Sequence, residues 1–328
     1  MDLKNKRVLV TGAGGFIGSH LVEKLVECGA QVRAFVRYNS KNLWGWLETL
    51  PVCQEIQNFT GDLRDFDSVK KAVQGTDVVF HLGALIGIPY SYTSPLAYLK
   101  TNVEGTYNIL QAAREAGTQR VVLTSTSEVY GTAQYVPIDE SHPMQPQSPY
   151  SASKISADML GLSYYLSFGL PVVIARPFNT YGPRQSARAI IPTIITQILS
   201  GRRELSLGNT SPTRDLNYVL DTVNGFIQLA QAEQALGQVV NIGSGREIAI
   251  GELVNLIASL MQTEVVVVQD SQRVRPEKSE VERLLCNAAK IRSLTSWQPE
   301  YTLEQGLAKT IELFEKNMAY YKPEVYNV

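Results

Sequence analysis

Short apolar segments alternate with longer amphipathic segments through the first half of the chain, and this alternation limits the possible folds more than any other feature. The apolar segments have the length of buried strands, and they lie at 7–10, 31–36, 78–81, 120–123 and 172–175. The amphipathic segments have the 3.6-residue period of helices, and they lie at 16–28, 67–74, 102–116 and 150–168. Strands joined through helices run in the same direction. The pattern therefore predicts a parallel sheet covered by helices on both faces.

The alternation becomes irregular after Arg176, where proline and glycine cluster between 177 and 192. A helix at 218–230 and a strand at 239–242 then return to the earlier pattern. We predict an α/β fold: a Rossmann-like doubly wound parallel sheet with a smaller mixed α/β substrate-binding domain. The two domains interleave along the chain. The dinucleotide-binding domain is expected at 1–175 plus 217–245, and the substrate-binding domain at 176–216 plus 246–328.

Composition argues against several classes of function. The 328 residues carry a formal net charge of −1, so no overall positive field exists to gather nucleic acid or anionic lipid. No apolar stretch approaches the roughly 20 residues that cross a bilayer. The cysteines and histidines are few and scattered, which argues against disulfides and against a metal site, and is typical of a cytoplasmic protein. They are Cys28, Cys53, Cys286, His20, His81 and His142.

A glycine-rich loop joins the first predicted strand to the first predicted helix. Gly12, Gly15 and Gly18 form a GxxGxxG pattern. Gly12 permits a tight turn, Gly15 lets the backbone approach a pyrophosphate, and Gly18 lets the helix lie close to the strand. The helix N-terminus offers unpaired N–H groups to phosphate oxygens. In this strand–loop–helix context the pattern predicts a dinucleotide site.

The predicted cofactor is NADP or NAD. Dinucleotide folds usually carry an acidic residue about 20 positions after the loop, where it binds the ribose 2′-hydroxyl. This sequence has Arg37 in that region, and a cation suits the 2′-phosphate of NADP, although an arginine stacked on adenine serves either cofactor. We therefore favour NADP. Asp62 follows in a Gly-Asp-Leu turn and is expected to hold the adenine through its carboxylate.

Tyr150 and Lys154 begin the predicted helix 150–168 and share one of its faces, because residues four apart are neighbours on a helix. An ammonium group beside a phenol stabilises the phenolate. Lys154 is therefore expected to lower the pKa of Tyr150, which would then accept a hydroxyl proton while a hydride leaves the same carbon.

A dense polar run follows the strand 120–123, at the position where ligands bind in open parallel sheets. Thr126 is expected to bridge a substrate oxygen and Tyr150. Glu128 brings a carboxylate to the same place, and Ser127 lies between them. Together with the Tyr150/Lys154 pair, these residues form the predicted catalytic set.

These motifs resemble the extended short-chain dehydrogenase/reductase superfamily over nearly the whole chain. The resemblance is carried by the glycine loop, by the Tyr150/Lys154 pair and by the segment Arg-Pro-Phe-Asn-Thr-Tyr-Gly-Pro-Arg at 176–184. Ser-Thr-Ser-Glu-Val-Tyr-Gly at 125–131 is similar to the nucleotide-sugar dehydratase branch. More narrowly, 88–92, 185–192 and 275–280 resemble the N-acetylglucosamine 4,6-dehydratases of legionaminic acid biosynthesis.

The resemblance implies roles for individual residues. Tyr150, assisted by Thr126 and Lys154, would serve oxidation at C4, and Glu128 would remove the C5 proton before water leaves from C6. Many dehydratases have Asp where this chain has Ser127, so Glu128 would also have to donate the proton to the leaving hydroxyl. Further cofactor contacts are implied at Phe16, Ile17, Leu63, Leu82, Gly83, Ala84 and Pro177.

The nucleotide sugar is expected to meet several cations and a few neutral side chains. The resemblance implies that Asn179 contacts the diphosphate. Arg214 and Arg275 are candidate phosphate clamps, Tyr90 would line the sugar pocket, and Arg184 and Arg188 are further expected substrate contacts. The resemblance also implies a homodimer built from the helices 102–116 and 150–168.

The sequence leaves the reaction open between three possibilities. The first is dehydration of UDP- or GDP-N-acetylglucosamine. The second is 4-epimerisation or UDP-glucuronate decarboxylation on the same fold, because Thr-Ser-Glu also occurs in decarboxylases. The third is a non-catalytic NAD(P)-sensing protein, against which the intact catalytic set argues.

Overall fold

The computed structural model describes residues 1–323 and 325. Within them the largest sheet has seven parallel strands, in the order β10-β6-β5-β4-β1-β2-β3. Strand order reverses between β1 and β4, which is the point where open α/β sheets bind ligands. The predicted doubly wound α/β fold is confirmed. The strands are β1 (Arg7–Thr11), β2 (Gln31–Arg37), β3 (Gln57–Gly61), β4 (Val78–His81), β5 (Arg120–Thr124), β6 (Val172–Pro177) and β10 (Val239–Ile242).

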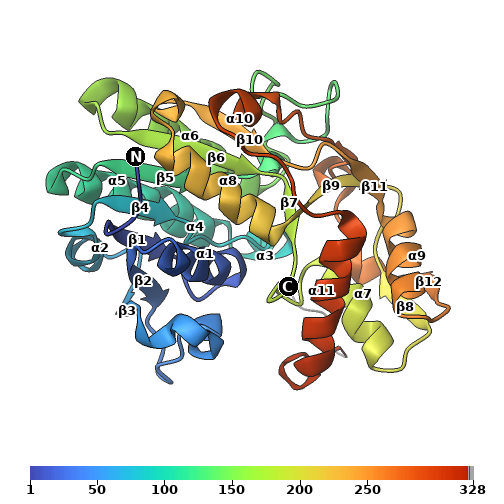
Figure 1. The fold of residues 1–328 in the computed structure, drawn as a ribbon. Helices are drawn as coiled ribbons and strands as arrows, with labels where there is room; N and C mark the ends of the chain where they lie inside the picture. Colours follow the sequence, from blue (N-terminus) through green and yellow to red (C-terminus); the bar gives the residue numbers. More distant parts are fainter. Residues whose placement is uncertain (324, 326–328) are drawn as a thin grey trace.

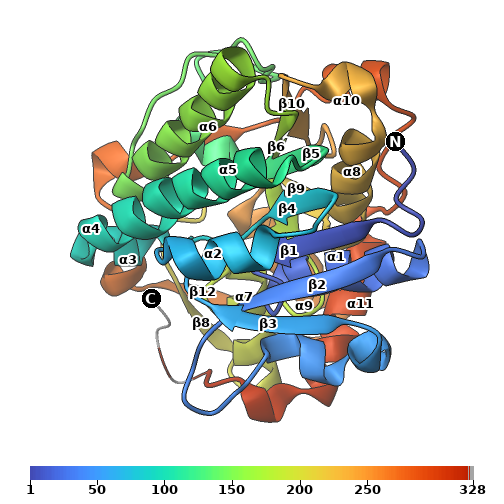
Figure 2. The same cartoon turned by 90° about the vertical axis from the view of Figure 1, so that its left-hand side faces the viewer.

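Helices cover both faces of this sheet because successive side chains of each strand point to opposite sides. In β1, Leu9 joins a cluster with residues of α2, α5 and α6, whereas Val8 and Val10 join a cluster with residues of α1 and α8. Figure 2 shows α2, α5 and α6 lying side by side over one face. The helices are α1 (Phe16–Glu27), α2 (Phe66–Val73), α5 (Gly105–Ala116), α6 (Pro149–Phe168) and α8 (Val219–Gln231).

A smaller mixed region lies beyond the carboxyl ends of the strands, beside α11 in Figure 1. It holds a sheet of β11, β9, β13 and β7 and a separate β8–β12 pair. The division of the chain into the two predicted domains stays a prediction. Its elements are β7 (Asn179–Tyr181), α7 (Ile190–Leu199), β8 (Glu204–Leu207), β9 (Thr213–Tyr218), β11 (Glu247–Ala249), α9 (Ile250–Leu260), β12 (Val266–Gln269), β13 (Arg283–Leu284) and α11 (Leu303–Lys316). The short helix α10 (Ala289–Leu294) instead lies beside β10 of the large sheet.

One helix differs from its predicted form. Ahead of α5, the short helices α3 (Ile88–Thr93) and α4 (Pro95–Tyr98) lead into a π-helical turn at Leu99–Glu104. This turn presents the buried Asn102 amide to the backbone of Leu85, where Oδ1 accepts from the N–H at 2.8 Å and Nδ2 donates to the carbonyl at 2.9 Å. Asn102 therefore fixes the loop that follows β4. Among the described residues, no helix is both long and apolar enough to span a bilayer.

Candidate active site

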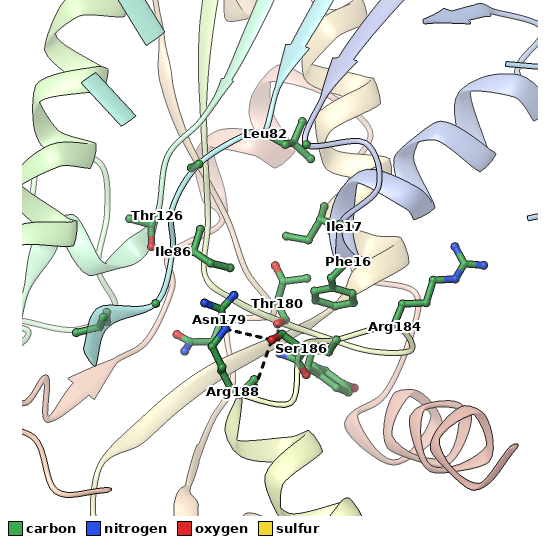
Figure 3. Close-up of a pocket in the computed structure, with 18 of the residues that line it drawn as sticks. Phe16, Ile17, Leu82, Ile86, Thr126, Asn179, Thr180, Arg184, Ser186 and Arg188 are labelled. Atoms are coloured by element: carbon green, nitrogen blue, oxygen red, sulfur yellow. Dashed lines mark hydrogen bonds between the residues drawn. The ribbon is translucent and has the colours of Figure 1, made fainter. Parts of the chain in front are cut away.

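A cavity of about 1500 Å³ opens at the carboxyl ends of β1, β4, β5 and β6. It begins at the glycine loop and Arg37, passes Tyr150, and ends at the arginines of the smaller region. Figure 3 shows Phe16, Ile17 and Leu82 on one side of this space and Asn179, Ser186 and Arg188 on another. One cavity thus joins the predicted cofactor residues to most of the predicted substrate residues.

The glycine loop leaves the N-terminus of α1 open. Its N-cap, Gly15, makes no side-chain capping bond, so the first N–H groups face the cavity. Gly12 has a left-handed φ of 69°. A Cβ on Gly18 would lie 2.2 Å from the Gly12 carbonyl oxygen, so only glycine fits there. This cradle of backbone atoms fits a pyrophosphate.

Most of the other predicted cofactor residues also line the cavity. They are Phe16, Ile17, Arg37, Leu82, Gly83, Ala84, Tyr150, Lys154 and Pro177. Asp62 and Leu63 do not line it, and their contacts with the cofactor stay predictions. The Asp62 carboxylate is bound by Arg64, with Nε 2.9 Å from Oδ1, and this hydrogen bond lowers the pKa of Asp62. Leu63 lies in the apolar cluster behind Gly83.

Residues 44–46 form a strap against the glycine loop that no motif in the sequence indicated. Trp46 N–H donates to the Gly14 carbonyl at 3.1 Å, and a Cβ on Gly14 would lie 2.3 Å from the Trp44 carbonyl oxygen. Trp44 and Gly45 line the cavity. The strap therefore forms part of the cavity wall beside the glycine loop.

The sequence also did not predict a role for His81, which supports the loop after β4. Gly83 N–H donates to Thr11 Oγ1 at 3.0 Å, and that hydroxyl lies 2.8 Å from His81 Nδ1. The other ring nitrogen lies 3.2 Å from Thr106 Oγ1, whose hydroxyl donates to the Asn102 carbonyl. Burial lowers the pKa of His81 to about 3, so the ring is neutral and can accept from Thr11. Only tertiary structure brings these residues together.

All five predicted catalytic residues line the same stretch of the cavity: Thr126, Ser127, Glu128, Tyr150 and Lys154. Their placement has local causes. Ser148 and Ser151 form a capping box that starts α6 just before Tyr150. Thr126 caps the 3₁₀ turn that carries Glu128, whose N–H donates to Thr126 Oγ1 at 3.2 Å, and Thr126 is also hydrogen-bonded to Tyr150.

The electrostatics of the Tyr150/Lys154 pair differ from the prediction. Burial raises the pKa of Tyr150 well above its usual value, and the hydrogen bond from Thr126 opposes this only in part. Lys154 Nζ donates to the Thr124 carbonyl at 2.5 Å, and burial lowers the pKa of this lysine. The expected lowering of the Tyr150 pKa by Lys154 is therefore absent from this geometry, because the ammonium is directed at a backbone oxygen.

The substrate end contains a partly buried arrangement of opposite charges. Glu280 Oε1 lies 3.5 Å from both Arg214 Nη2 and Arg275 Nη1, and all three residues line the cavity. The charge of Glu128 also acts on Arg214. Asn179 and Arg188 line the same end. These predicted substrate residues are thus brought within reach of one ligand.

Arg184 and Tyr90 make contacts with other parts of the protein that the sequence did not indicate. Arg184 has a left-handed φ of 68°, and its Nη2 pairs with Glu23 Oε2 of α1 at 3.0 Å. Figure 3 shows its side chain extending away from the other labelled residues, although Arg184 still lines the cavity, so its contact with substrate stays a prediction. Tyr90 is absent from the lining and packs instead on Tyr98, with 6.1 Å between ring centroids. Tyr98 in turn lies edge-on to Tyr150 at 6.2 Å.

Comparison with known proteins agrees with this geometry. The family model described as GDP-mannose 4,6 dehydratase matches residues 9–310. A dTDP-glucose 4,6-dehydratase of Streptomyces antibioticus is 33% identical over 320 residues, which are 96% of this chain and 94% of that protein. A UDP-N-acetyl-alpha-D-glucosaminuronate decarboxylase of Bacillus cytotoxicus is 34% identical over 327 residues, 95% of this chain and 98% of that one.

Solved structures give the same result. The epimerase Mth375 of Methanothermobacter thermautotrophicus superposes with a TM-score of 0.89 at 28% identity, covering 97% of this chain and 94% of its own. DesIV, a dTDP-glucose 4,6-dehydratase of Streptomyces venezuelae with NAD bound, superposes with a TM-score of 0.86 at 30% identity, covering 97% and 99%. The chain therefore belongs to the nucleotide-sugar 4,6-dehydratase branch of the extended short-chain dehydrogenase/reductases, enzymes that use a nicotinamide cofactor.

Proposed function

We propose that the enzyme converts UDP- or GDP-N-acetylglucosamine to the 4-keto-6-deoxy sugar by eliminating water. The observation that carries this proposal is the presence of two proton-transfer groups, Tyr150 and Glu128, in one stretch of the cavity, close enough for their charges to interact. Oxidation at a single carbon requires only the tyrosine. A carboxylate beside it supplies the base for a second, neighbouring carbon.

Each residue has a defined part in this reaction. When bound, the nicotinamide cofactor supplies the hydride acceptor and later the hydride donor. Tyr150, hydrogen-bonded to Thr126, takes the proton of the C4 hydroxyl while the C4 hydride departs. Glu128 then takes the C5 proton, which the new C4 ketone acidifies. The same carboxyl would give that proton to the C6 hydroxyl, which leaves as water, while the bound cofactor would supply the hydride for C6. C5 would then take a proton from solvent, and Tyr150 would release the C4 hydroxyl proton to solvent.

Ser127 affects how the leaving hydroxyl is protonated. The side chain is buried, with 2% exposed, and its hydroxyl is a poor acid. Glu128 is therefore assigned both the proton abstraction and the proton donation.

The substrate class is supported from two directions. The segments 88–92, 185–192 and 275–280 resemble N-acetylglucosamine dehydratases, and the Bacillus relative is named for an N-acetylated sugar nucleotide. Arg214 and Arg275 lie at the far end of the cavity, where paired guanidinium groups suit a diphosphate. The dTDP-glucose dehydratases among the relatives make dTDP-glucose the first comparison substrate.

Glu128→Gln tests the proposal directly. The variant should still oxidise C4 and should accumulate reduced cofactor, seen as dihydronicotinamide absorbance, without releasing a 4-keto-6-deoxy product. Tyr150→Phe is the matched control, because it should block the first step and leave the cofactor oxidised. In heavy water the wild-type product should carry deuterium at C5. A wild-type product that keeps its C6 hydroxyl and has no deuterium at C5 would contradict dehydration.

The alternative functions predict different outcomes of the same assay. A 4-epimerase returns the hydride to C4 and leaves C5 unlabelled. A decarboxylase releases carbon dioxide from a uronate and ignores N-acetylhexosamine. A non-catalytic sensor binds the cofactor and changes no sugar at all. Product mass from a panel of UDP-, GDP- and dTDP-sugars separates these cases.

We also propose that NADP binds more tightly than NAD. Arg37 lines the cavity at the carboxyl end of β2, where a cation suits a 2′-phosphate. Arg37→Asp should reverse or shrink the preference, measured by calorimetry with both cofactors. Tighter NAD binding by the wild type would refute this assignment and leave the reaction untouched.

A homodimer is proposed on the basis of α5 and α6. Both helices expose large apolar side chains: Tyr107, Met159, Leu166 and Phe168. Light scattering should give twice the mass of the 36.3 kDa chain, and Leu166→Glu should shift it toward the monomer. A wild-type monomer at working concentration would defeat this proposal.

The unpaired cysteines Cys28, Cys53 and Cys286 support the proposed cytoplasmic location.

A further inference from the structure

The catalytic segment Thr126–Glu128 is attached at both sides to one buried ion pair. Asp158 of α6 and Arg176 of β6 are each 2% exposed, and Arg176 Nη2 lies 2.7 Å from Asp158 Oδ2. On one side of the segment, Ser125 Oγ donates to the same Asp158 oxygen at 2.6 Å. On the other side, Tyr130 Oη accepts from Arg176 Nη1 at 2.8 Å.

The attachment continues into the sheet. The Tyr130 hydroxyl donates to Asn241 Oδ1 of β10 at 2.8 Å, and Ser125 N–H donates to the Ala175 carbonyl at 2.8 Å. The Arg176 guanidinium also lies over the Tyr130 ring, 4.8 Å from its centroid. The catalytic segment is therefore held by hydrogen bonds to the buried strands β6 and β10, and water does not compete for these bonds.

Helix α6 carries both the catalytic Tyr150 and Asp158, which supports the segment that holds Glu128. Tyr150, Lys154 and Asp158 are spaced four residues apart on α6, so they lie on one face. Tyr150 and Lys154 line the cavity, and Asp158 lies below it among buried residues. Any movement of α6 thus moves Tyr150 and the support of Glu128 together.

We propose that Asp158, Arg176 and Tyr130 are positioning residues that set the distance between Glu128 and Tyr150, so that the two groups act on neighbouring carbons of one substrate; this rests on the proposed dehydration. A base misplaced by about 1 Å can lose roughly a hundredfold in rate. Loosening the support should therefore slow the step that uses Glu128 while sparing the step that uses Tyr150, which has its own anchor in the capped start of α6.

Tyr130→Phe is the decisive variant because it removes one hydroxyl and keeps the ring. Asp158→Asn would leave the buried Arg176 unpaired and is expected to unfold the protein. Tyr164→Phe is the matched control: Tyr164 is also buried on α6, and its hydroxyl donates to Gln111 at 3.0 Å, away from the catalytic segment. In the holoenzyme, Tyr130→Phe should slow product formation about 10- to 100-fold with KM unchanged. Substrate-driven reduction of the cofactor should stay within about twofold of the wild type.

Two outcomes overturn the positioning role. The first is that Tyr130→Phe slows cofactor reduction and product formation equally, or slows neither of them. The other comes from amide hydrogen exchange of residues 126–131 in the complex with the cofactor alone, which needs no substrate. Exchange there should be faster in Tyr130→Phe than in Tyr164→Phe, and equal rates refute the positioning role whatever sugar the enzyme uses. If exchange rises but no water is lost from any sugar nucleotide, the proposed dehydration fails and the positioning role stands.

Discussion

At one end of the cavity the segment Gly12 to Gly18 offers mainly backbone atoms to a ligand, whereas at the other end the charged groups are side chains from distant segments. Gly15 and Gly18 present N–H groups and closely packed backbone to a pyrophosphate. Arg188, Arg214 and Arg275 present charged groups on separate elements. Backbone placement follows from local sequence, but the direction of a long side chain depends on which partner it finds.

Tyr150 lies where the two ends meet, and its removal should have the largest effect. Tyr150→Phe should lower kcat by about 10²–10⁴-fold, because the phenol is the acid–base group of the first step. Cofactor affinity, measured by calorimetry, should change little because the glycine loop is untouched. Unchanged turnover in this variant would remove Tyr150 from the mechanism.

The arginines test whether position in the sequence predicts contact with substrate. Arg275→Met should raise the KM for the sugar nucleotide by about 10- to 100-fold, since a charged hydrogen bond contributes roughly 1.5–3 kcal/mol. Arg184→Met is the matched variant and should change KM by less than about threefold, because the Arg184 side chain extends away from the other labelled residues and its ion pair with Glu23 is shorter, at 3.0 Å, than that of Arg275 with Glu280, at 3.5 Å. Steady-state kinetics of both variants under saturating cofactor give the comparison. Equal rises in KM would place Arg184 on the substrate after all.

At the cofactor end, two glycine-to-alanine substitutions should separate protein stability from cofactor affinity. Gly18→Ala should lower the melting temperature, because the new Cβ would lie 2.2 Å from the Gly12 carbonyl, and such overpacking costs about 1–3 kcal/mol. In Gly15→Ala the corresponding distance to the same carbonyl is 3.2 Å, so stability should be nearly kept while cofactor affinity falls. Thermal melts without cofactor and calorimetry with it separate the two effects. A stable Gly18→Ala protein would contradict the close packing of helix and strand.

The smallest expected effect is on the pH dependence of stability, through a hydrogen bond that joins α1 to the segment after β7. His20 Nε2–H donates to the Pro183 carbonyl at 3.0 Å, and burial, aided by the charge of Arg184, lowers the pKa of His20 to about 4. Between pH 6.5 and about 4 the unfolded chain binds a proton that the folded chain does not, so stability falls as pH falls through this window. His20→Gln should show a shallower loss of melting temperature over that range. An identical pH slope in both proteins would show that His20 is protonated when folded.

The elements and residues that the sequence predicted share a local cause. Strand β4 was placed at its observed bounds, and the start of α6 follows from Ser148. The predicted catalytic residues line one cavity because the carboxyl ends of neighbouring parallel strands meet at one edge. Their individual roles stay predictions.

What the sequence missed depends on tertiary partners. β3 is half exposed and has one large apolar residue, Phe59, so its pattern is weak. Asp62, Arg184 and Lys154 were assigned to ligands or to Tyr150, yet each binds a nearer group: Arg64, Glu23 and the Thr124 carbonyl. A long charged side chain reaches many positions, and sequence distance does not rank them.

The π-helical turn at Leu99–Glu104 has a consequence for how this protein can change over evolutionary time. Each residue added to or removed from an α-helix rotates everything beyond it by about 100°. Deleting one residue within the turn would therefore swing the Asn102 amide away from Leu85, although every side chain in the segment were otherwise kept. We expect this stretch to accept many substitutions on its exposed side and to reject any change in length.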